Sequence, residues 1–147
     1  MIDETIYDIF RRGSKTYFYS TLFFPPRVRK DVFSLYSFVR VADDYVDAVP
    51  QEVDEFYAFT GRYAAAAAGE ATGDVVIDSF VELAGRKDFD PAWTVAFLSS
   101  MESDITVTSY RTIRDLEGYL YGSSEVVGLM MARLLDLPPE SYVAAQN

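Results

Sequence analysis

Apolar residues recur at three- and four-residue intervals in the segment that ends near position 47, and this period constrains the fold more than any other feature of the sequence. A helix with such a stripe must bury it against other elements. Strand-type alternation is weak throughout the chain, so the sequence predicts an all-α protein. The residues of the stripe are Val32, Leu35, Tyr36, Val39, Ala42 and Val46.

Helix start and stop signals divide the rest of the chain. Asp90 precedes Pro91, the order expected of a capping residue followed by a proline in the first turn. Residues 112–115 resemble a capping box, and a proline pair at 138–139 separates two further segments. The sequence predicts helices near 3–12, 14–23, 27–49, 52–69, 74–86, 91–108, 112–136 and 139–147.

Asp43 and Asp47 lie four residues apart near the end of the helix predicted at 27–49, at the border of its apolar stripe. On a helix the two carboxylates share one face, with Arg40 one turn earlier. Like charges at this spacing destabilise a helix by about 0.2–0.5 kcal/mol. Solvated surface acids are the commoner explanation of such spacing. The alternative is a site for Mg²⁺, which is usually held by one or two carboxylates plus substrate phosphates, and the edge of a buried face suits it.

Composition excludes several classes of function. The 147-residue chain has a net charge of −10 and contains neither histidine nor cysteine. It therefore lacks Ser-His-Asp and Cys-His nucleophiles, the usual zinc ligand sets and disulfides. The negative charge argues against nucleic acid as a partner. The sequence has no signal-peptide pattern and no apolar run near the roughly 18 residues of a spanning helix, so we expect a cytoplasmic protein.

Three segments, in order along the chain, resemble the squalene/phytoene synthase family. They are SKTYFY at 14–19, before a proline pair; LYSFVR at 35–40, followed by DDYVD at 43–47; and YLYGSSEVVGLMM at 119–131. In the family, a Ser-Lys-Ser-Phe-like segment precedes a loop with proline, and a Tyr-Ala-Phe-x-Arg helix ends in a D-x-x-x-D motif. A Tyr-x-Tyr-x-x-Ala-x-x-Val-Gly helix follows. The resemblance implies the isoprenoid synthase helical bundle, with its active site in the central cavity.

The resemblance also implies roles for individual residues. Asp43 and Asp47 would be catalytic metal ligands for Mg²⁺ or Mn²⁺, and Tyr119 would help to steady a carbocation. The positions that match substrate-binding positions of the family are Ser14, Lys15, Tyr17, Arg40, Ser123 and Val127.

These residues have structural interpretations as well. Ser14 is suited to capping a helix, and Arg40 can pair internally with Asp43 or Asp44. The small residues at 122–128 leave room for a prenyl chain, or equally for a close-packed neighbouring helix.

The reaction implied by the resemblance is the head-to-head condensation of two identical prenyl diphosphates, begun by metal-assisted ionisation of an allylic diphosphate. Conversion of geranylgeranyl diphosphate to phytoene is preferred over conversion of farnesyl diphosphate to squalene or dehydrosqualene. The reason is that nothing identifiable marks a nicotinamide site, although use of NADPH stays open. Peripheral membrane contact through lipid headgroups is compatible with such apolar substrates.

The second D-x-x-x-D motif of the family has no counterpart here. Asp74 and Asp78 have the spacing but follow Gly73 at a helix start, where capping and dipole complementation are expected. We therefore expect residues 1–147 to be the amino-terminal part of one synthase domain, lacking the second motif and incomplete for activity alone. The alternatives are a non-catalytic prenyl-binding or assembly partner with the same fold, and one chain of a two-chain synthase. The candidate protein partners are a complementing carboxyl-terminal chain and further copies of this chain in a homo-oligomer.

Overall fold

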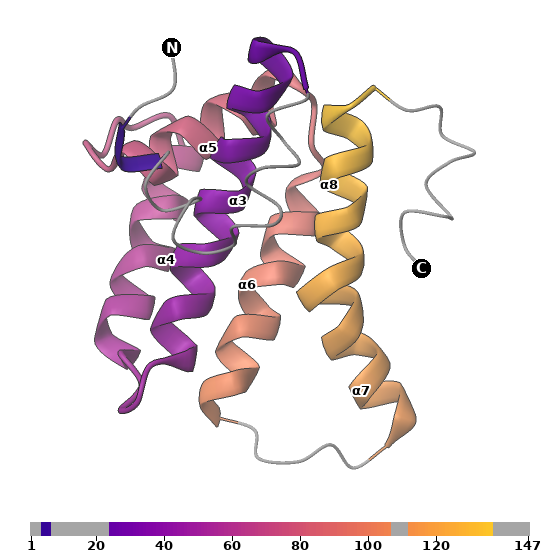
Figure 1. Cartoon of the computed structure of the whole chain (residues 1–147). Coiled ribbons are helices and arrows are strands. Elements are labelled where there is room, and N and C mark those ends of the chain that lie inside the picture. The colour runs from indigo at the N-terminus through magenta and orange to yellow at the C-terminus, as the bar shows by residue number, and fades with distance from the viewer. Residues whose placement is uncertain (1–3, 7–23, 107–111, 137–147) are drawn as a thin grey trace.

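Residues 4–6, 24–106 and 112–136 are described by the computed structural model, and they form a bundle of helices without strands (Figure 1). The bounds agree closely with those predicted, which confirms the all-α fold class. The helices predicted at 14–23 and 139–147, and most of that at 3–12, lie outside these ranges. The elements are α3 (Pro26–Asp47), α4 (Val53–Ala67), α5 (Val75–Arg86), α6 (Pro91–Thr106), α7 (Ile113–Leu120), the π-helical turn η1 (Tyr121–Glu125) and α8 (Val126–Leu134).

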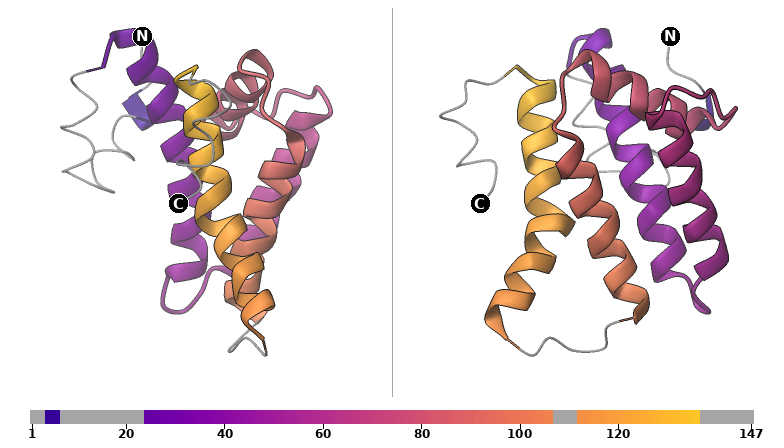
Figure 2. Two further views of the ribbon diagram at one scale, coloured as in Figure 1. Left: turned by 90° about the vertical axis from the view of Figure 1, so that its right-hand side faces the viewer. Right: turned by 180° about the vertical axis from the view of Figure 1, so that it is seen from behind.

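The helices form two antiparallel pairs (Figures 1 and 2). Helix α3 lies beside α4, and α6 lies beside the run α7–η1–α8, while the short α5 packs against both α3 and α4. The carboxyl ends of α3 and α6 and the start of α7 all lie at the lower end of the bundle in Figure 1. No helix among the described residues is both long enough and apolar enough to cross a membrane.

The capping signals in the sequence act as predicted. The Asp90 carboxylate accepts a hydrogen bond of 2.9 Å from the amide of Ala92, at the start of α6. The Thr112 hydroxyl accepts one of 3.1 Å from the amide of Asp115, at the start of α7. Each cap satisfies an amide that has no partner within its own helix.

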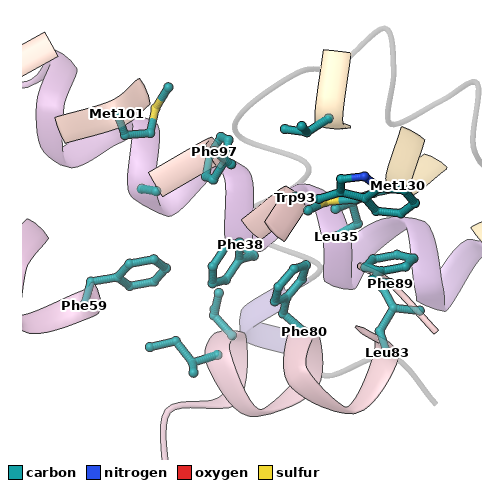
Figure 3. Close-up of a cluster of buried hydrophobic side chains, with 14 of the residues drawn as sticks. Leu35, Phe38, Phe59, Phe80, Leu83, Phe89, Trp93, Phe97, Met101 and Met130 are labelled. Carbon is teal, nitrogen blue, oxygen red and sulfur yellow. The ribbon is translucent and has the colours of Figure 1, made fainter. Parts of the chain in front are cut away.

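The core is aromatic and centres on Phe38 of α3 (Figure 3). The Phe38 ring stacks on that of Phe80 in α5, with centroids 4.0 Å apart. Its centroid also lies 5.1 Å from that of Phe59 in α4 and 6.2 Å from that of Phe97 in α6. One buried ring therefore ties α3 to three other helices.

An ion pair links α3 to α5 near the amino-terminal end of α3. Asp31 is buried, and both of its carboxylate oxygens accept hydrogen bonds from Arg86, at 2.6 and 3.0 Å. The guanidinium also binds Glu82 one turn earlier on α5. This bidentate geometry compensates for the desolvation of Asp31.

The helix predicted at 112–136 is interrupted by the π-helical turn η1. A π-helical turn inserts an extra residue, so carbonyl groups beside it lose their usual intrahelical partners. Two serines supply donors: Ser100 of α6 to the carbonyl of Tyr119 at 3.2 Å, and Ser124 to that of Leu120 at 2.9 Å. The segment predicted as one helix is therefore divided into α7, η1 and α8.

We predict that Gly122→Ala destabilises the fold, because Gly122 lies where η1 meets α6. A Cβ atom at this position would overlap the Ser100 hydroxyl oxygen and the Ala96 carbonyl oxygen. Backbone must move to relieve such overpacking, so the free energy of unfolding should fall by roughly 1–3 kcal/mol. Denaturant-induced unfolding followed by circular dichroism measures the change.

The matched control is Gly118→Ala in α7, where a Cβ atom meets nothing within 4 Å. Alanine is the better helix former, so this variant should be neutral or more stable by up to about 1 kcal/mol. Equal effects of the two substitutions would contradict the close approach of η1 and α6.

Candidate functional site

The carboxyl groups of Asp43 and Asp47 contact one another, as their four-residue spacing predicts. Burial, the negative charge of Asp47 and a hydrogen bond between the two side chains raise the pKa of Asp43 from 3.8 to about 6. Asp43 is half-buried and Asp47 is exposed, so the pair lies at the border between core and solvent. A hydrogen bond between two carboxyl groups requires a proton, whose charge a hard divalent cation can replace. The donor set therefore fits Mg²⁺ or Mn²⁺.

Two carboxylates form only part of a metal site. Within the described ranges, no group of three or more acidic, histidine or cysteine side chains is arranged to hold a metal ion. Mg²⁺ keeps several waters and commonly combines one or two protein carboxylates with substrate phosphates. The pair thus suits a cation that binds together with a phosphorylated substrate.

Arg40 lies one turn before the acidic pair and is held by neighbours on α3. Its Nε atom donates to Asp44 Oδ1 at 3.1 Å, one of the two internal pairings that the sequence allows. A second hydrogen bond joins it to the hydroxyl of Tyr36, whose pKa is raised chiefly by burial. The Arg40 side chain remains 39% exposed, so an anion can reach the guanidinium.

Tyr36 is an additional candidate site residue, because it is hydrogen-bonded to Arg40. From the sequence it is identified only as a member of the apolar stripe. Its four-residue spacing from Arg40 is the signal that identifies it, because residues at this spacing share one helix face.

Tyr119 reaches the acidic end of the bundle from the second helix pair. Its hydroxyl donates to Asp104 Oδ2 at 3.2 Å. Burial raises the pKa of Asp104, the Tyr119 hydrogen bond opposes that shift, and the negative charge of Asp47 adds to it. The structure therefore brings Tyr119, Asp104 and Asp47 into one electrostatic environment. Asp104 belongs to no motif that the sequence alone reveals.

The other predicted site residues are not joined to the acidic pair by these contacts. Val127 packs against the hydrophobic core, and Ser123 is half-buried within η1. Ser14, Lys15 and Tyr17 lie outside the described residues. The substrate-binding role of all five stays a prediction.

Asp74 and Asp78 organise the start of α5, as the sequence predicts. Asp74 caps the helix by accepting hydrogen bonds from two amides in its first turn, at 3.0 and 3.3 Å. Asp78 accepts hydrogen bonds from Thr72, which lower its pKa, and from the amide of Gly73. Both carboxylates are engaged in this turn, so they do not form a second metal-binding motif.

Comparison with known proteins extends this description. A model of the squalene/phytoene synthase family matches residues 10–147. The 15-cis-phytoene synthase of Paracoccus sp. is 31% identical over 133 residues, and the phytoene synthase of Pseudescherichia vulneris is 30% identical over 139. The 4,4'-diapophytoene synthase of Staphylococcus haemolyticus is 24% identical over 142 residues.

The three alignments cover 84%, 87% and 92% of this chain but only 44%, 45% and 50% of those proteins. The chain thus spans about half the length of the curated relatives it matches. The family match includes the acidic pair, Arg40, Asp104 and Tyr119. Because it extends over nearly the whole sequence, the chain belongs to the squalene/phytoene synthase family.

Proposed function

We propose that this chain supplies the first of the two D-x-x-x-D motifs of a head-to-head prenyl synthase. The enzyme would be a transferase that condenses two identical prenyl diphosphates in isoprenoid biosynthesis. Geranylgeranyl diphosphate, converted to phytoene, is the preferred substrate, and this proposal assigns no reductant. The names of the relatives from Paracoccus sp. and Pseudescherichia vulneris support this preference. Conversion of farnesyl diphosphate to squalene or dehydrosqualene is the second choice.

The observation that carries the proposal is the contact between the Asp43 and Asp47 carboxyl groups. Asp43 and Asp47 share one helix face, and burial together with Asp47 raises the pKa of Asp43 to about 6. Ionising both carboxyl groups therefore destabilises the metal-free fold. A bound Mg²⁺ or Mn²⁺ would neutralise their charge and that of the leaving diphosphate. Asp43 and Asp47 would hold the ion through their oxygens.

The remaining residues act on the substrate itself. Arg40, one turn away, binds diphosphate oxygens with a fixed positive charge. Ionisation breaks the bond between carbon and oxygen, so negative charge grows on the leaving group and positive charge on the allylic carbon. This chemistry needs no histidine base, which agrees with a sequence that contains none. Tyr119 steadies the allylic cation through its ring and its hydroxyl oxygen.

The proposal predicts pyrophosphate release from geranylgeranyl diphosphate by the full-length gene product, in the presence of Mg²⁺ or Mn²⁺ but not of EDTA. Asp43→Asn or Asp47→Asn should lower the turnover number by on the order of 100-fold or more, because each removes an anionic ligand. A coupled pyrophosphate assay gives the rates.

Asp88→Asn is the matched control. Asp88 is an exposed carboxylate on the α5–α6 connection with φ 56°, a conformation that asparagine tolerates. It should turn over at the wild-type rate. Wild-type turnover in the Asp43 and Asp47 variants would refute the ligand assignment. Tight binding of the diphosphate without release would instead favour a prenyl-binding partner that lacks catalysis.

We further predict that Asp43→Asn stabilises the metal-free protein near pH 7.5. The folded state binds the Asp43 proton more tightly than the unfolded state, with a pKa of about 6 against 3.8. The contribution of Asp43 to stability is therefore present below about pH 4 and is lost as the pH rises through 6. At pH 7.5 the variant should gain about 1 kcal/mol, less than the full shift implies because the side chain is half exposed.

Thermal unfolding in EDTA, at pH 4.5 and 7.5, tests this prediction. The advantage of Asp43→Asn should shrink at the lower pH, and adding Mn²⁺ should stabilise the wild type more than the variant. A variant that is less stable than the wild type at pH 7.5 would show that Asp43 has a stabilising partner instead.

A further inference from the structure

We infer that Asp104 is a positioning residue, which holds the hydroxyl of Tyr119 at the end of the bundle that carries the acidic pair. The inference rests on the proposed function, because the orientation of Tyr119 matters only if this end of the bundle binds a substrate. It adds to the site a residue of α6, a helix from which the sequence motifs contribute nothing.

Tyr119 is held by α6 at two points. The Ser100 hydroxyl donates to its backbone carbonyl at 3.2 Å, and Asp104 Oδ2 accepts from its phenol at 3.2 Å. Ser100 and Asp104 are four residues apart, so they lie on one face of α6, one turn from each other. Gly122 lets η1 approach that face closely, since a Cβ atom there would overlap the Ser100 hydroxyl. The backbone and the hydroxyl group of Tyr119 are therefore both held by α6.

Asp104 is in turn fixed to α3 by Gln51, in the connection between α3 and α4. The side-chain amide of Gln51 donates to the carbonyl oxygen of Val46 and to that of Asp104, each at 2.9 Å. Val46 directly precedes Asp47. The amide thus joins the backbone next to one acidic residue to the backbone of Asp104, and a chain of hydrogen bonds runs from the end of α3 to Tyr119.

The direction of the phenol hydrogen bond has a chemical consequence. A hydroxyl that donates to a carboxylate carries more negative charge on its oxygen, and its proton is turned away from other acceptors. The Tyr119 oxygen then presents its lone pairs on the sides away from Asp104. An oriented and polarised oxygen of this kind suits a position beside an allylic cation.

The first test reads the environment of Tyr119 without any need for turnover. Tyrosine labelled with ¹³C at Cζ gives NMR signals, and loss of one signal in Tyr119→Phe assigns it. Asp104→Ala, and to a smaller extent Asp104→Asn, should shift the Tyr119 signal, because the phenol loses its anionic acceptor. Glu102→Gln is the matched control on the same helix. The Glu102 side chain is hydrogen-bonded to Tyr57, so this substitution should shift the Tyr57 signal and leave the Tyr119 signal in place.

The second test is kinetic and uses the pyrophosphate assay on the full-length gene product. Asp104→Ala and Asp104→Asn should each lower kcat by on the order of 10- to 100-fold with little change in KM, as expected for a residue that orients a catalytic group. In the Tyr119→Phe background the same substitutions should have almost no further effect. A residue needed only for folding would lower the rate by equal factors in both backgrounds.

The two tests separate the inference from the proposed function. An unshifted Tyr119 signal in both Asp104 variants overturns the inference, whether or not the protein turns over substrate. Losses of kcat that multiply between Asp104→Asn and Tyr119→Phe overturn it as well. A wild-type protein that releases no pyrophosphate, but whose Tyr119 signal depends on Asp104, refutes the proposed function and leaves the positioning contact established.

Discussion

The packing of Phe38 is the constraint on which the candidate site depends. Its ring is enclosed by phenylalanines from α4, α5 and α6, so α3 cannot rotate about its axis without breaking all three contacts (Figure 3). Close-packed interiors do not deform continuously. The orientation of α3 is therefore settled in the core, and it sets Asp43 and Asp47 at the edge of the buried stripe rather than within it or fully in solvent.

The polar contacts around the acidic pair leave its charge poorly compensated. Arg40 is the nearest cation along α3, yet it pairs with Asp44 and with the Tyr36 hydroxyl. Its charge lowers the pKa of Asp43 less than burial and Asp47 raise it. A protein selected for stability alone has simple ways to remove this repulsion, such as a single Asp→Asn change. Retention of the charge is what a site that binds a cation requires.

Local rules explain which features the sequence predicts. The period of the apolar residues gives the helices, the capping signals give their starts, and four-residue spacing gives the contact between Asp43 and Asp47. The features that escape prediction depend on contacts between distant parts of the chain. Gln51 and Asp104 are 53 residues apart and meet only after α3, α4 and α6 have packed. The π-helical turn is not predictable from local sequence for the same reason. It occurs where α6 approaches Gly122 closely, and this is a contact between distant parts of the chain.

The separation between the aromatic core and the polar end of the bundle also bears on how the site is interpreted. The rings around Phe38 supply the packing, whereas Gln51, Asp104 and Tyr119 form a hydrogen-bonded chain at the ends of α3 and α6. Such a chain adds little net stability, since each of its bonds replaces a bond to water. Its effect is instead to fix the relative positions of groups from three segments of the sequence. Geometry of this kind is what catalysis by positioning and electrostatics demands, and it is one of the reasons why we propose that this end of the bundle binds a substrate.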